Sequence, residues 1–476
     1  MHRPIVAISI ALVLALAAPV LALEPVDINP AIAAKIDVAL EAATGTTSGQ
    51  TPALSVAVLE HGKIVYARAF GVSDLATKSQ ATPHTRFRIA SLTKMFTAVS
   101  IMQLVEAQRI KLDAPLAAYL PDAPHASEVT IRQLLMHTSG IWNYGDAAFT
   151  NPHVTEPILP GAIVASTASH PLDHLPGASF SYSNTGYVLL GMVVESITHR
   201  RLADYEREHI FLPAKMNETT CGDPEGAVDF ARGYMDATGA VPPAYSPSWF
   251  FADGDIVSTA SDIARFDAAL LDGRLIKPAT FSEMQSSAGS APMLGNGVMY
   301  GLGLMLVSMS GMTLVGHHGG VPGFVAQNDM VPASGFAVVV LSDAYDFATA
   351  NASHAVVRQT FPALFASSPN PPLAAVEDPS VTAKLRGFLQ SVQRGTIDRM
   401  TLTAAMNDAL TPAALTGLAK ALEPLASPPP LVVRSTQSLA GFTAFQYEAT
   451  FTNGRKSTIT FSLDTTGKIA GFFLSK

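Results

Sequence analysis

The most informative stretch of the sequence reads Phe87-Arg88-Ile89-Ala90-Ser91-Leu92-Thr93-Lys94 and contains the only Ser-x-x-Lys of the chain. The residues that follow, Met95 to Glu106, have the apolar spacing of a buried helix. Side chains three residues apart on a helix are neighbours, so we expect the Ser91 hydroxyl and the Lys94 amine on one face. A serine needs a nearby base to become a nucleophile, and a lysine in apolar surroundings can serve as that base. Because the pattern also arises by chance on helix surfaces, it does not by itself decide between catalysis and structure.

A second polar segment reads Phe180-Ser181-Tyr182-Ser183-Asn184-Thr185-Gly186-Tyr187 and stands before an apolar helical pattern that ends near Ile197. Tyr182 is able to relay a proton, and the charge of a nearby Lys94 would favour its anionic form. The Asn184 carboxamide can donate to a substrate carbonyl while it bonds to the lysine. The alternative is a Tyr and an Asn that only cap the helix, since Asn is a favoured N-cap residue.

A third segment reads Gly316-His317-His318-Gly319-Gly320-Val321-Pro322-Gly323-Phe324 and is expected at the end of a strand and the start of a turn. Glycines there let the backbone approach a ligand closely. The main-chain amides of Ser91 and Gly320 would together form a two-donor hole for the oxyanion of a tetrahedral intermediate.

The histidine pair suggests a metal site as the competing interpretation, together with His170 and His174. Adjacent residues of a strand point to opposite faces, and Pro171 interrupts a helical pairing of the other two histidines. We therefore predict no metal. A phosphate-binding loop is also not predicted, because no Gly-Lys-Ser/Thr ending follows the glycines.

The three segments, in this order and with these separations, resemble the signatures of a family of serine hydrolases. That family includes class C β-lactamases, penicillin-binding DD-peptidases, D-aminopeptidases and family VIII esterases, and the matching motifs are Ser91-x-x-Lys94, Tyr182-x-Asn184 and His317-x-Gly319. The resemblance covers roughly residues 30 to 365. Two more stretches are similar to recurrent family segments, Leu134-Leu135-Met136-His137-Thr138-Ser139-Gly140-Ile141 and Val257-Ser258-Thr259-Ala260-Ser261-Asp262.

The resemblance implies an α/β fold with a β-lactamase/transpeptidase-like antiparallel sheet flanked by helices, an all-helical lobe, and a cleft between them. It implies that Ser91 is acylated, that Lys94 and Tyr182 share the proton removed from it, and that water later releases the acyl group. Substrate binding is then expected from Asn184, His317, Gly319 and Gly320, and no cofactor is implied.

Two departures from the family pattern bear on the substrate. Relatives of the β-lactamase and DD-peptidase type usually have Lys at the position of His317, and an unperturbed histidine is mostly neutral at pH 7. Asp253-Gly254-Asp255 stands where family members often have Ala-Gly-Gly, which adds two carboxylates near the cleft. Both departures favour esters, amides or D-amino-acid peptides over substrates that require a bound carboxylate.

Length and composition indicate a globular protein with a large core. The chain has 476 residues, of which 48% are hydrophobic and 14% charged, and this length favours two domains. Residues 1–22 combine a basic start, an apolar run from Ile5 to Ala17 and small residues before Leu23, as in a cleaved secretory signal peptide. The run is shorter than the roughly 20 residues that span a bilayer, so we predict no stable membrane insertion and a periplasmic or secreted location.

The formal net charge of −8 at pH 7 argues against nucleic acid as a partner. The single Cys221 cannot form an internal disulfide. The expected partner is a small-molecule ester, amide or peptide substrate, and the sequence leaves the oligomeric state open.

The domain prediction follows the pattern of elements along the chain. The hydrolase domain is predicted over 23–366, with a helix from Pro30 to Ala43 and a hairpin around His61-Gly62. The later strands of its sheet are predicted at Tyr300–Val307, Met312–Val315, Phe324–Met330 and Phe336–Leu341. A Pro-containing linker over 367–372 leads to an α+β accessory domain over 373–476. In that domain we expect helices at Val381–Gln393 and Thr401–Leu425, then three or four antiparallel strands between Leu431 and Leu474.

The sequence therefore predicts an exported serine hydrolase that acts through an acyl-enzyme on esters, amides or D-amino-acid peptides. One alternative is a β-lactamase or DD-carboxypeptidase. The other is a binding module that recognises peptidoglycan fragments or β-lactams without turnover, or that releases its acyl group slowly.

Overall fold

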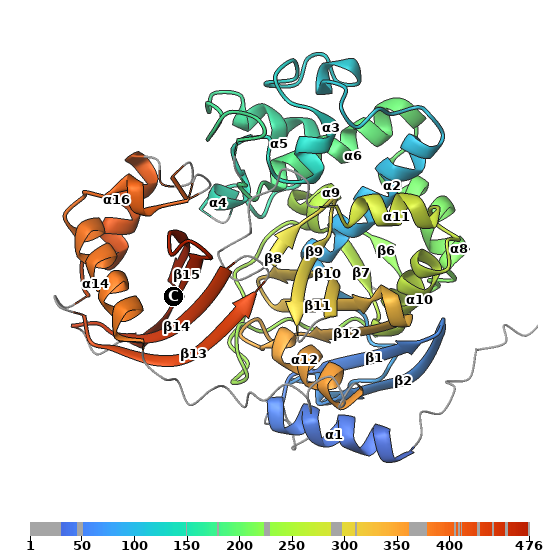
Figure 1. Cartoon of the computed structure of the whole chain (residues 1–476). Coiled ribbons are helices and arrows are strands. Elements are labelled where there is room, and N and C mark those ends of the chain that lie inside the picture. The colour runs from blue at the N-terminus through green and yellow to red at the C-terminus, as the bar shows by residue number, and fades with distance from the viewer. Residues whose placement is uncertain are drawn as a thin grey trace, which may run out of the picture.

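The structure is a computed structural model (Figure 1). It describes residues 30–44, 51–148, 150–178, 180–222, 229–286, 298–309, 312–360, 378–403, 406–407, 410, 412–425, 429–439, 442–452 and 456–474. The predicted signal peptide over 1–22 and the predicted linker over 367–372 lie outside the described residues.

A seven-stranded antiparallel sheet forms the centre of the larger part of the chain, in the order β2-β1-β12-β11-β10-β9-β8. Its strands are β1 (Leu54–Glu60), β2 (Lys63–Phe70), β8 (Val298–Tyr300), β9 (Met305–Met309), β10 (Met312–Val321), β11 (Phe324–Val331) and β12 (Phe336–Ser342). The β1–β2 hairpin turns at His61 and Gly62, which both have positive φ, and β1 pairs with β12. The two ends of this part of the chain thus complete one sheet, as the sequence predicted.

Both faces of the sheet are buried. Because successive side chains of a strand point to opposite faces, one strand contributes to two different cores. Val338 and Val340 of β12 belong to the core between the sheet and the helices α1 (Pro30–Thr44) and α12 (Thr349–Thr360). Val339 and Leu341 belong to the larger core on the other face, where α10 (Ala260–Leu271) packs. Figure 1 shows α1 at the bottom of the view, below the sheet.

A helical lobe lies at the top of the view in Figure 1. Its helices, and those that join it to the sheet, are α2 (Thr93–Glu106), α3 (Ile131–Leu135), α4 (Gly145–Ala148), α5 (Pro160–Thr167), α6 (Asn184–Thr198), α7 (Leu202–Glu206), α8 (Leu212–Ala214), α9 (Phe251–Gly254) and α11 (Pro278–Met284). Helix α2 is buried along nearly its whole length, which explains why its sequence is apolar on all sides. None of the described helices is long and apolar enough to cross a membrane.

A small three-stranded sheet, in the order β5-β7-β6, joins segments that are distant in sequence: β5 (Phe87–Arg88), β6 (Thr220–Cys221) and β7 (Ile256–Ser258). Phe87 pairs with Ser258 and Arg88 with Val257. This pairing fixes the chain just before Ser91 against the chain just after Asp253. A further two-stranded sheet consists of β3 (Val72–Asp74) and β4 (Ser79–Gln80).

Two expectations about the central sheet differ from the structure. The predicted strand over Tyr300–Val307 is divided into β8 and β9, because the chain turns at Gly303, which has φ of 79° and no room for a Cβ against Ala98. The segment from His317 to Gly320 lies inside β10, and the turn comes at Pro322 and Gly323.

The C-terminal part has its own four-stranded antiparallel sheet, in the order β13-β14-β15-β16, and its own hydrophobic core. Its elements are α14 (Pro379–Gln393), α16 (Pro412–Leu422), β13 (Leu431–Leu439), β14 (Phe442–Thr450), β15 (Lys456–Asp464) and β16 (Ile469–Leu474). The helix predicted over Thr401–Leu425 is interrupted in the structure: a 3₁₀ turn occupies Arg399–Thr401, residues 406–407 are helical, Leu410 is not, and α16 begins at Pro412. The exact domain boundaries stay predictions.

Candidate active site

Ser91 and Lys94 lie at the start of the buried helix α2. Ser91 is in a 3₁₀ turn, Ala90–Leu92, and Lys94 is in the first turn of α2. The Lys94 ammonium donates to Ser91 Oγ at 3.1 Å, to Asn184 Oδ1 at 2.7 Å and to the backbone carbonyl of Asp253 at 2.8 Å. These three acceptors use all three donors of a protonated lysine. The geometry fulfils the expectation that the hydroxyl and the amine are neighbours.

The environment of Lys94 brings it close to its neutral form. Its side chain is 0% exposed. Burial lowers the pKa of Lys94 to about 8, while the charge of Asp253 acts in the opposite direction. A lysine has to be neutral before it can accept a proton. When its pKa is near the working pH, the free-energy cost of deprotonating it is small. Lys94 is thus suited to take the proton of Ser91.

Tyr182 contacts the same two residues. Its hydroxyl hydrogen-bonds with Ser91, and its ring centroid is 4.9 Å from Lys94 Nζ. Burial raises the pKa of Tyr182 above that of a free phenol, although the bond to Ser91 acts in the opposite direction. The phenol therefore stays neutral, which differs from the expectation that Lys94 would favour its anion. A neutral Tyr182 can still pass a proton between the serine and the lysine.

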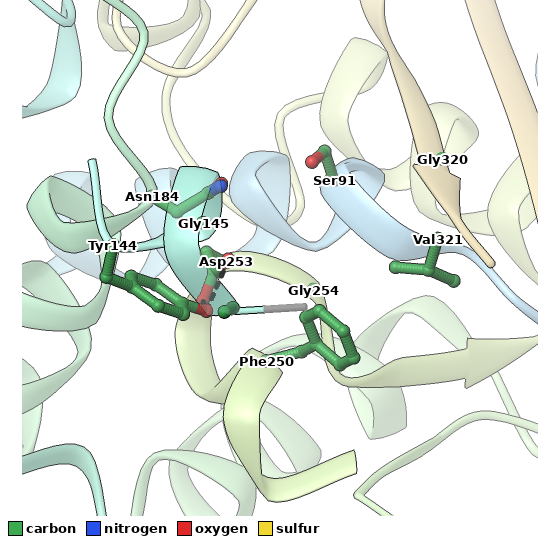
Figure 2. Close-up of a pocket in the computed structure, with 10 residues that line it drawn as sticks. Ser91, Tyr144, Gly145, Asn184, Phe250, Asp253, Gly254, Gly320 and Val321 are labelled. Carbon is green, nitrogen blue, oxygen red and sulfur yellow. Dashed lines mark hydrogen bonds between the residues drawn. The ribbon is translucent and has the colours of Figure 1, made fainter. Parts of the chain in front are cut away.

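Asn184 begins α6 without capping it. The N-cap is Ser183, whose side chain accepts from the backbone N–H of Gly186 at 3.3 Å. The Asn184 carboxamide is therefore available for Lys94, and Figure 2 shows it pointing toward Ser91. Gly145 makes this possible, because a Cβ there would lie 2.5 Å from Asn184 Nδ2.

Strand β10 passes directly beside Ser91. Its pairing with β9 ends at Gly316, so the edge from His317 onward is free of β9. A Cβ on Gly319 would lie 2.3 Å from the carbonyl oxygen of Ile89 and 3.0 Å from the backbone nitrogen of Ser91. Only a glycine permits this approach. Gly320, one residue further, lines the same cavity as Ser91.

His317 is near the site but is not among the residues that line the cavity. It is 1% exposed, its Nδ1 lies 2.5 Å from the carbonyl oxygen of His318, and its Nε2 lies 2.8 Å from the Tyr300 hydroxyl. Burial lowers the pKa of His317 well below the ordinary value, with the Lys94 charge acting in the same direction. The ring is neutral and both nitrogens are engaged inside the protein. A direct bond from His317 to substrate, as the sequence suggested, is not available in this arrangement.

The side chains surround a cavity of about 80 Å³ (Figure 2). It is lined by Ser91, Tyr144, Gly145, Ala148, Asn184, Phe250, Asp253, Gly254, Gly320 and Val321. This space is enough for roughly five water molecules, which suits a small acyl group better than a large one. Within the described ranges, no cluster of three or more His, Cys, Asp or Glu side chains is arranged to hold a metal ion.

Asp253 and Tyr144 are site residues whose roles the sequence did not reveal. The Tyr144 hydroxyl lies 3.1 Å and 3.2 Å from the two carboxylate oxygens of Asp253 and also bonds to the carbonyl of Trp249. Burial raises the pKa of the Asp253 carboxyl to about 6, against the effect of Lys94. Asp253 was noticeable as a departure from the family pattern, whereas Tyr144 had no signal in the sequence.

His137 is a further residue that reasoning from the sequence left without a role, although it lies in one of the recurrent family stretches. Its ring packs on Tyr182 and its Nδ1 accepts from the backbone N–H of Ser183 at 3.1 Å. It has φ of 56°, and its side chain is buried. His137 thus holds the segment that carries Tyr182.

This fold, with a serine, a lysine and a tyrosine meeting between a sheet and a helical lobe, defines the class of β-lactamase-related proteins. The family model described as Beta-lactamase matches residues 33–359, and the chain belongs to this family.

Three relatives illustrate the range of the family. A penicillin-binding protein of Bacillus subtilis (strain 168) is 33% identical over 290 residues, which are 57% of this chain and 63% of that protein. A D-aminopeptidase of Brucella canis (strain ATCC 23365 / NCTC 10854 / RM-666) is 30% identical over 292 residues, 58% of this chain and 53% of the relative. The chain thus spans less than two thirds of the length of both. The crystal structure of D-amino acid amidase from Ochrobactrum anthropi SV3 complexed with D-phenylalanine matches with a TM-score of 0.60 and 29% identity, covering 70% of this chain and 99% of that one.

Proposed function

We propose that the protein is a serine hydrolase that acts through an acyl-enzyme on esters, amides or D-amino-acid peptides. The observation that carries this proposal is the single hydrogen-bonded group formed by Ser91, Lys94 and Tyr182. The Lys94 nitrogen is 3.1 Å from Ser91 Oγ, and the Tyr182 hydroxyl also hydrogen-bonds with Ser91. A serine and a lysine without a catalytic role on a helix surface would not be expected to be buried or to share these hydrogen bonds.

In the first half of the reaction, neutral Lys94 takes the proton of Ser91, directly or through Tyr182, as Ser91 Oγ attacks the substrate carbonyl carbon. The negative charge that develops on the carbonyl oxygen is stabilised by the backbone N–H groups of Ser91 and Gly320. When the tetrahedral intermediate collapses, the bond to the leaving group breaks and the leaving nitrogen or oxygen receives that proton. The acyl group stays on Ser91.

In the second half, a water molecule gives its proton to the same pair of residues and its oxygen attacks the acyl carbon. The ester bond to Ser91 breaks, the proton returns to Ser91 Oγ, and the carboxylic acid leaves. Asn184 orients the carbonyl in both halves through the amide group that Lys94 does not occupy.

Amides and esters without a required carboxylate are favoured as substrates for two reasons. His317 is neutral and internally bonded, so it provides no fixed positive charge for a substrate carboxylate. Asp253, in the cavity wall, opposes an anion there. Two of the relatives are named D-aminopeptidase and D-amino acid amidase, which supports D-aminoacyl amides as the first substrates to try.

The test compares the purified protein, its Ser91→Ala variant and Ser166→Ala as a matched control. Ser166 lies on α5, where its hydroxyl bonds to the carbonyl of Ile163. We expect turnover of a short-chain nitrophenyl ester and a D-aminoacyl anilide, and labelling by a fluorophosphonate, in the wild type and Ser166→Ala only. Activity that persists in Ser91→Ala contradicts the proposal. Rapid hydrolysis of a chromogenic cephalosporin would indicate a β-lactamase instead, and a stable mass adduct without turnover would indicate a slowly deacylating receptor.

Two further parts of the proposal concern the ends of the sequence. We propose that residues 1–22 direct export and are then removed, which the N-terminal sequence of the protein recovered from its host would test directly. We also propose that the C-terminal α+β part has an accessory role, such as shaping access to the cleft. A variant without residues 371–476 should then keep a reactive Ser91 and change its substrate range or stability, and a folded truncation that loses labelling would contradict this role.

A further inference from the structure

The cavity beside Ser91 contains a single charged side chain. Among the described residues that line it, only Asp253 carries a charge, and it is only 3% exposed. The side chains of Phe250 and Val321 supply apolar surface to the same cavity, and Figure 2 places them on the side away from Asn184. A small substrate that enters the cavity therefore meets one negative group and an apolar wall.

The Asp253 carboxylate lacks a full set of donors from the protein. A carboxylate has about four acceptor positions, and a hydroxyl has one proton to give. Tyr144 shares its proton between this carboxylate and the carbonyl of Trp249, and the carboxylate's own backbone N–H gives it one further bond. Lys94 bonds to the backbone carbonyl of Asp253 rather than to its side chain, so acceptor positions remain open. A buried carboxylate with unused acceptor positions is energetically unfavourable, and a donor from a bound substrate would stabilise it by hydrogen bonding.

The position of Asp253 relative to Ser91 is fixed by the packing of α9. The Thr97 hydroxyl of α2 donates to the carbonyl of Ala252 at 2.7 Å. On the other side, Gly191 of α6 leaves room for α9, because a Cβ there would lie 2.4 Å from the Cβ of Ala252. Lys94 also bonds both Ser91 Oγ and the Asp253 carbonyl, so one nitrogen connects the two residues. The carboxylate is thus held in place before any substrate arrives.

We propose that Asp253 is a specificity-determining residue that binds a cationic group of the substrate, namely a primary ammonium on the carbon next to the carbonyl that Ser91 attacks. This inference rests on the function proposed above. In an α-amino acid amide the ammonium nitrogen lies about 2.5 Å from the carbonyl carbon. An ammonium group supplies three donors for the open acceptor positions of the Asp253 carboxylate, and it adds a positive charge to that of nearby Lys94.

The same contact assists the reaction as well as recognition. An ammonium bound at Asp253 would lie near Lys94, and like charges disfavour each other. Binding of the cationic substrate therefore favours the neutral form of Lys94, which is the form that accepts the proton of Ser91. A substrate whose amine is acylated loses both effects, and one with a carboxylate at this position is repelled by Asp253.

The experiment compares two anilides of nearly equal shape, D-alanine p-nitroanilide and isobutyryl p-nitroanilide, in which a methyl group replaces the ammonium. The quantity measured is the ratio of their kcat/KM values in the wild type and in Asp253→Asn. The effect of the substitution on Lys94 in the free protein is common to both substrates and cancels in the change of this ratio, so the change reports only what depends on the ammonium group. Charge-assisted hydrogen bonds indicate that the ratio should fall roughly tenfold to a hundredfold in Asp253→Asn.

Asp255→Asn is the matched control, because Asp255 lies two residues away and is not among the residues that line the cavity. It should leave the ratio unchanged. As a second measurement, D-alaninamide should protect Ser91 from fluorophosphonate labelling at a lower concentration than isobutyramide does, and this difference should disappear in Asp253→Asn. The inference is overturned if Asp253→Asn keeps the wild-type ratio, or if Asp255→Asn lowers it equally.

The outcome separates this inference from the proposed function. If Ser91 labels and turns over the neutral ester but shows no preference for the ammonium substrate, only the role of Asp253 is wrong. If Ser91 reacts with none of the esters, anilides and fluorophosphonates, the proposed function fails and the inference falls with it.

Discussion

The imidazole of His137 lies 4.2 Å from the ring of Tyr182, measured between the ring centroids, and the two planes are tilted by 35°. His137 also holds the backbone on both sides of Tyr182. Its carbonyl accepts from the N–H of Ser181 at 2.8 Å, and its Nδ1 accepts from the N–H of Ser183 at 3.1 Å. Burial lowers the pKa of His137 well below the ordinary value, so the ring stays a neutral acceptor. His137 is therefore a positioning residue for Tyr182.

Replacement of His137 by Ala should reduce kcat for nitrophenyl ester hydrolysis roughly tenfold to a hundredfold, because a small displacement of a proton-transferring group is costly. The KM should change little, since His137 does not line the cavity. Steady-state kinetics on a variant whose fold is verified by circular dichroism would measure both constants.

His137→Asn is the control for this prediction. Asparagine tolerates the φ of 56° at this position and offers an acceptor to the N–H of Ser183, but it lacks the ring. It should lose less activity than His137→Ala. An alanine variant with normal kcat and lowered stability would instead assign His137 a structural role alone.

Replacement of Gly319 by Ala should strongly slow the acylation of Ser91. The new Cβ would lie 2.3 Å from the carbonyl oxygen of Ile89, which is backbone and cannot rotate away. Strand β10 would have to move away from Ser91, and the oxyanion site between them would open. We expect the rate of fluorophosphonate labelling to fall at least about a hundredfold, as for loss of an oxyanion donor.

The neighbouring glycine provides a direct comparison. A Cβ on Gly320 would meet only the ring of Tyr345, at 3.6 Å, which is ordinary contact. Gly320→Ala keeps the backbone N–H and should label within about tenfold of the wild-type rate. If the two alanine variants lose labelling equally, close approach of β10 is not the reason that Gly319 is needed.

The sequence predicted those features of the fold that periodicity and short motifs determine. The β1–β2 hairpin, α2, α6 and α14 lie where the apolar spacing placed them, because each element is long and its pattern is regular. The division of Tyr300–Val307 was missed because it depends on contact between Gly303 and Ala98 of α2, a residue about two hundred positions away in the sequence. Similarly, the predicted helix over Thr401–Leu425 is interrupted: residues 406–407 are helical, Leu410 is not, and α16 begins at Pro412, which the apolar content alone did not reveal.

For the site, the motifs located Ser91, Lys94, Tyr182, Asn184 and Gly320 around one point. They did not reveal that His317 turns inward, because its environment depends on a contact with Tyr300, which belongs to none of the motifs. Tyr144 was missed because its place in the site depends on contacts with Trp249 and Asp253, which are far away in the sequence. Such residues act through tertiary contacts, and neither their type nor their spacing distinguishes them from ordinary core residues.

Buried Asp267 should make the protein less stable as the pH rises. It is 0% exposed and accepts from Asn328 Nδ2 at 2.7 Å, and burial raises its pKa to about 8. A carboxyl whose pKa is raised on folding contributes its full stability below the unfolded pKa near 4, and this contribution is lost as the pH rises through about 8. The asparagine of Asp267→Asn has no proton to lose. The free energy of unfolding of this variant, relative to that of the wild type, should therefore rise by about 2 to 5 kcal/mol between pH 5 and pH 9.

Urea denaturation of both proteins at several pH values would measure this difference. Asp272→Asn, at an exposed position, is the control and should follow the wild type throughout. Parallel stability curves for Asp267→Asn and the wild type would show that Asp267 is already ionised in the folded protein at neutral pH.

The reactivity of Ser91 should depend on pH through Lys94. Since the pKa of Lys94 is about 8 and its neutral form is the base, the rate of fluorophosphonate labelling should rise from pH 6 and level off above about pH 9. Asp253 raises the pKa of Lys94 by its charge, so Asp253→Asn should move the midpoint of this rise to lower pH. The measurement is the second-order labelling rate between pH 6 and pH 10 for both proteins. A wild-type rate that does not change over this range would exclude Lys94 as the base, and an unchanged midpoint in Asp253→Asn would show that the carboxylate does not act on it.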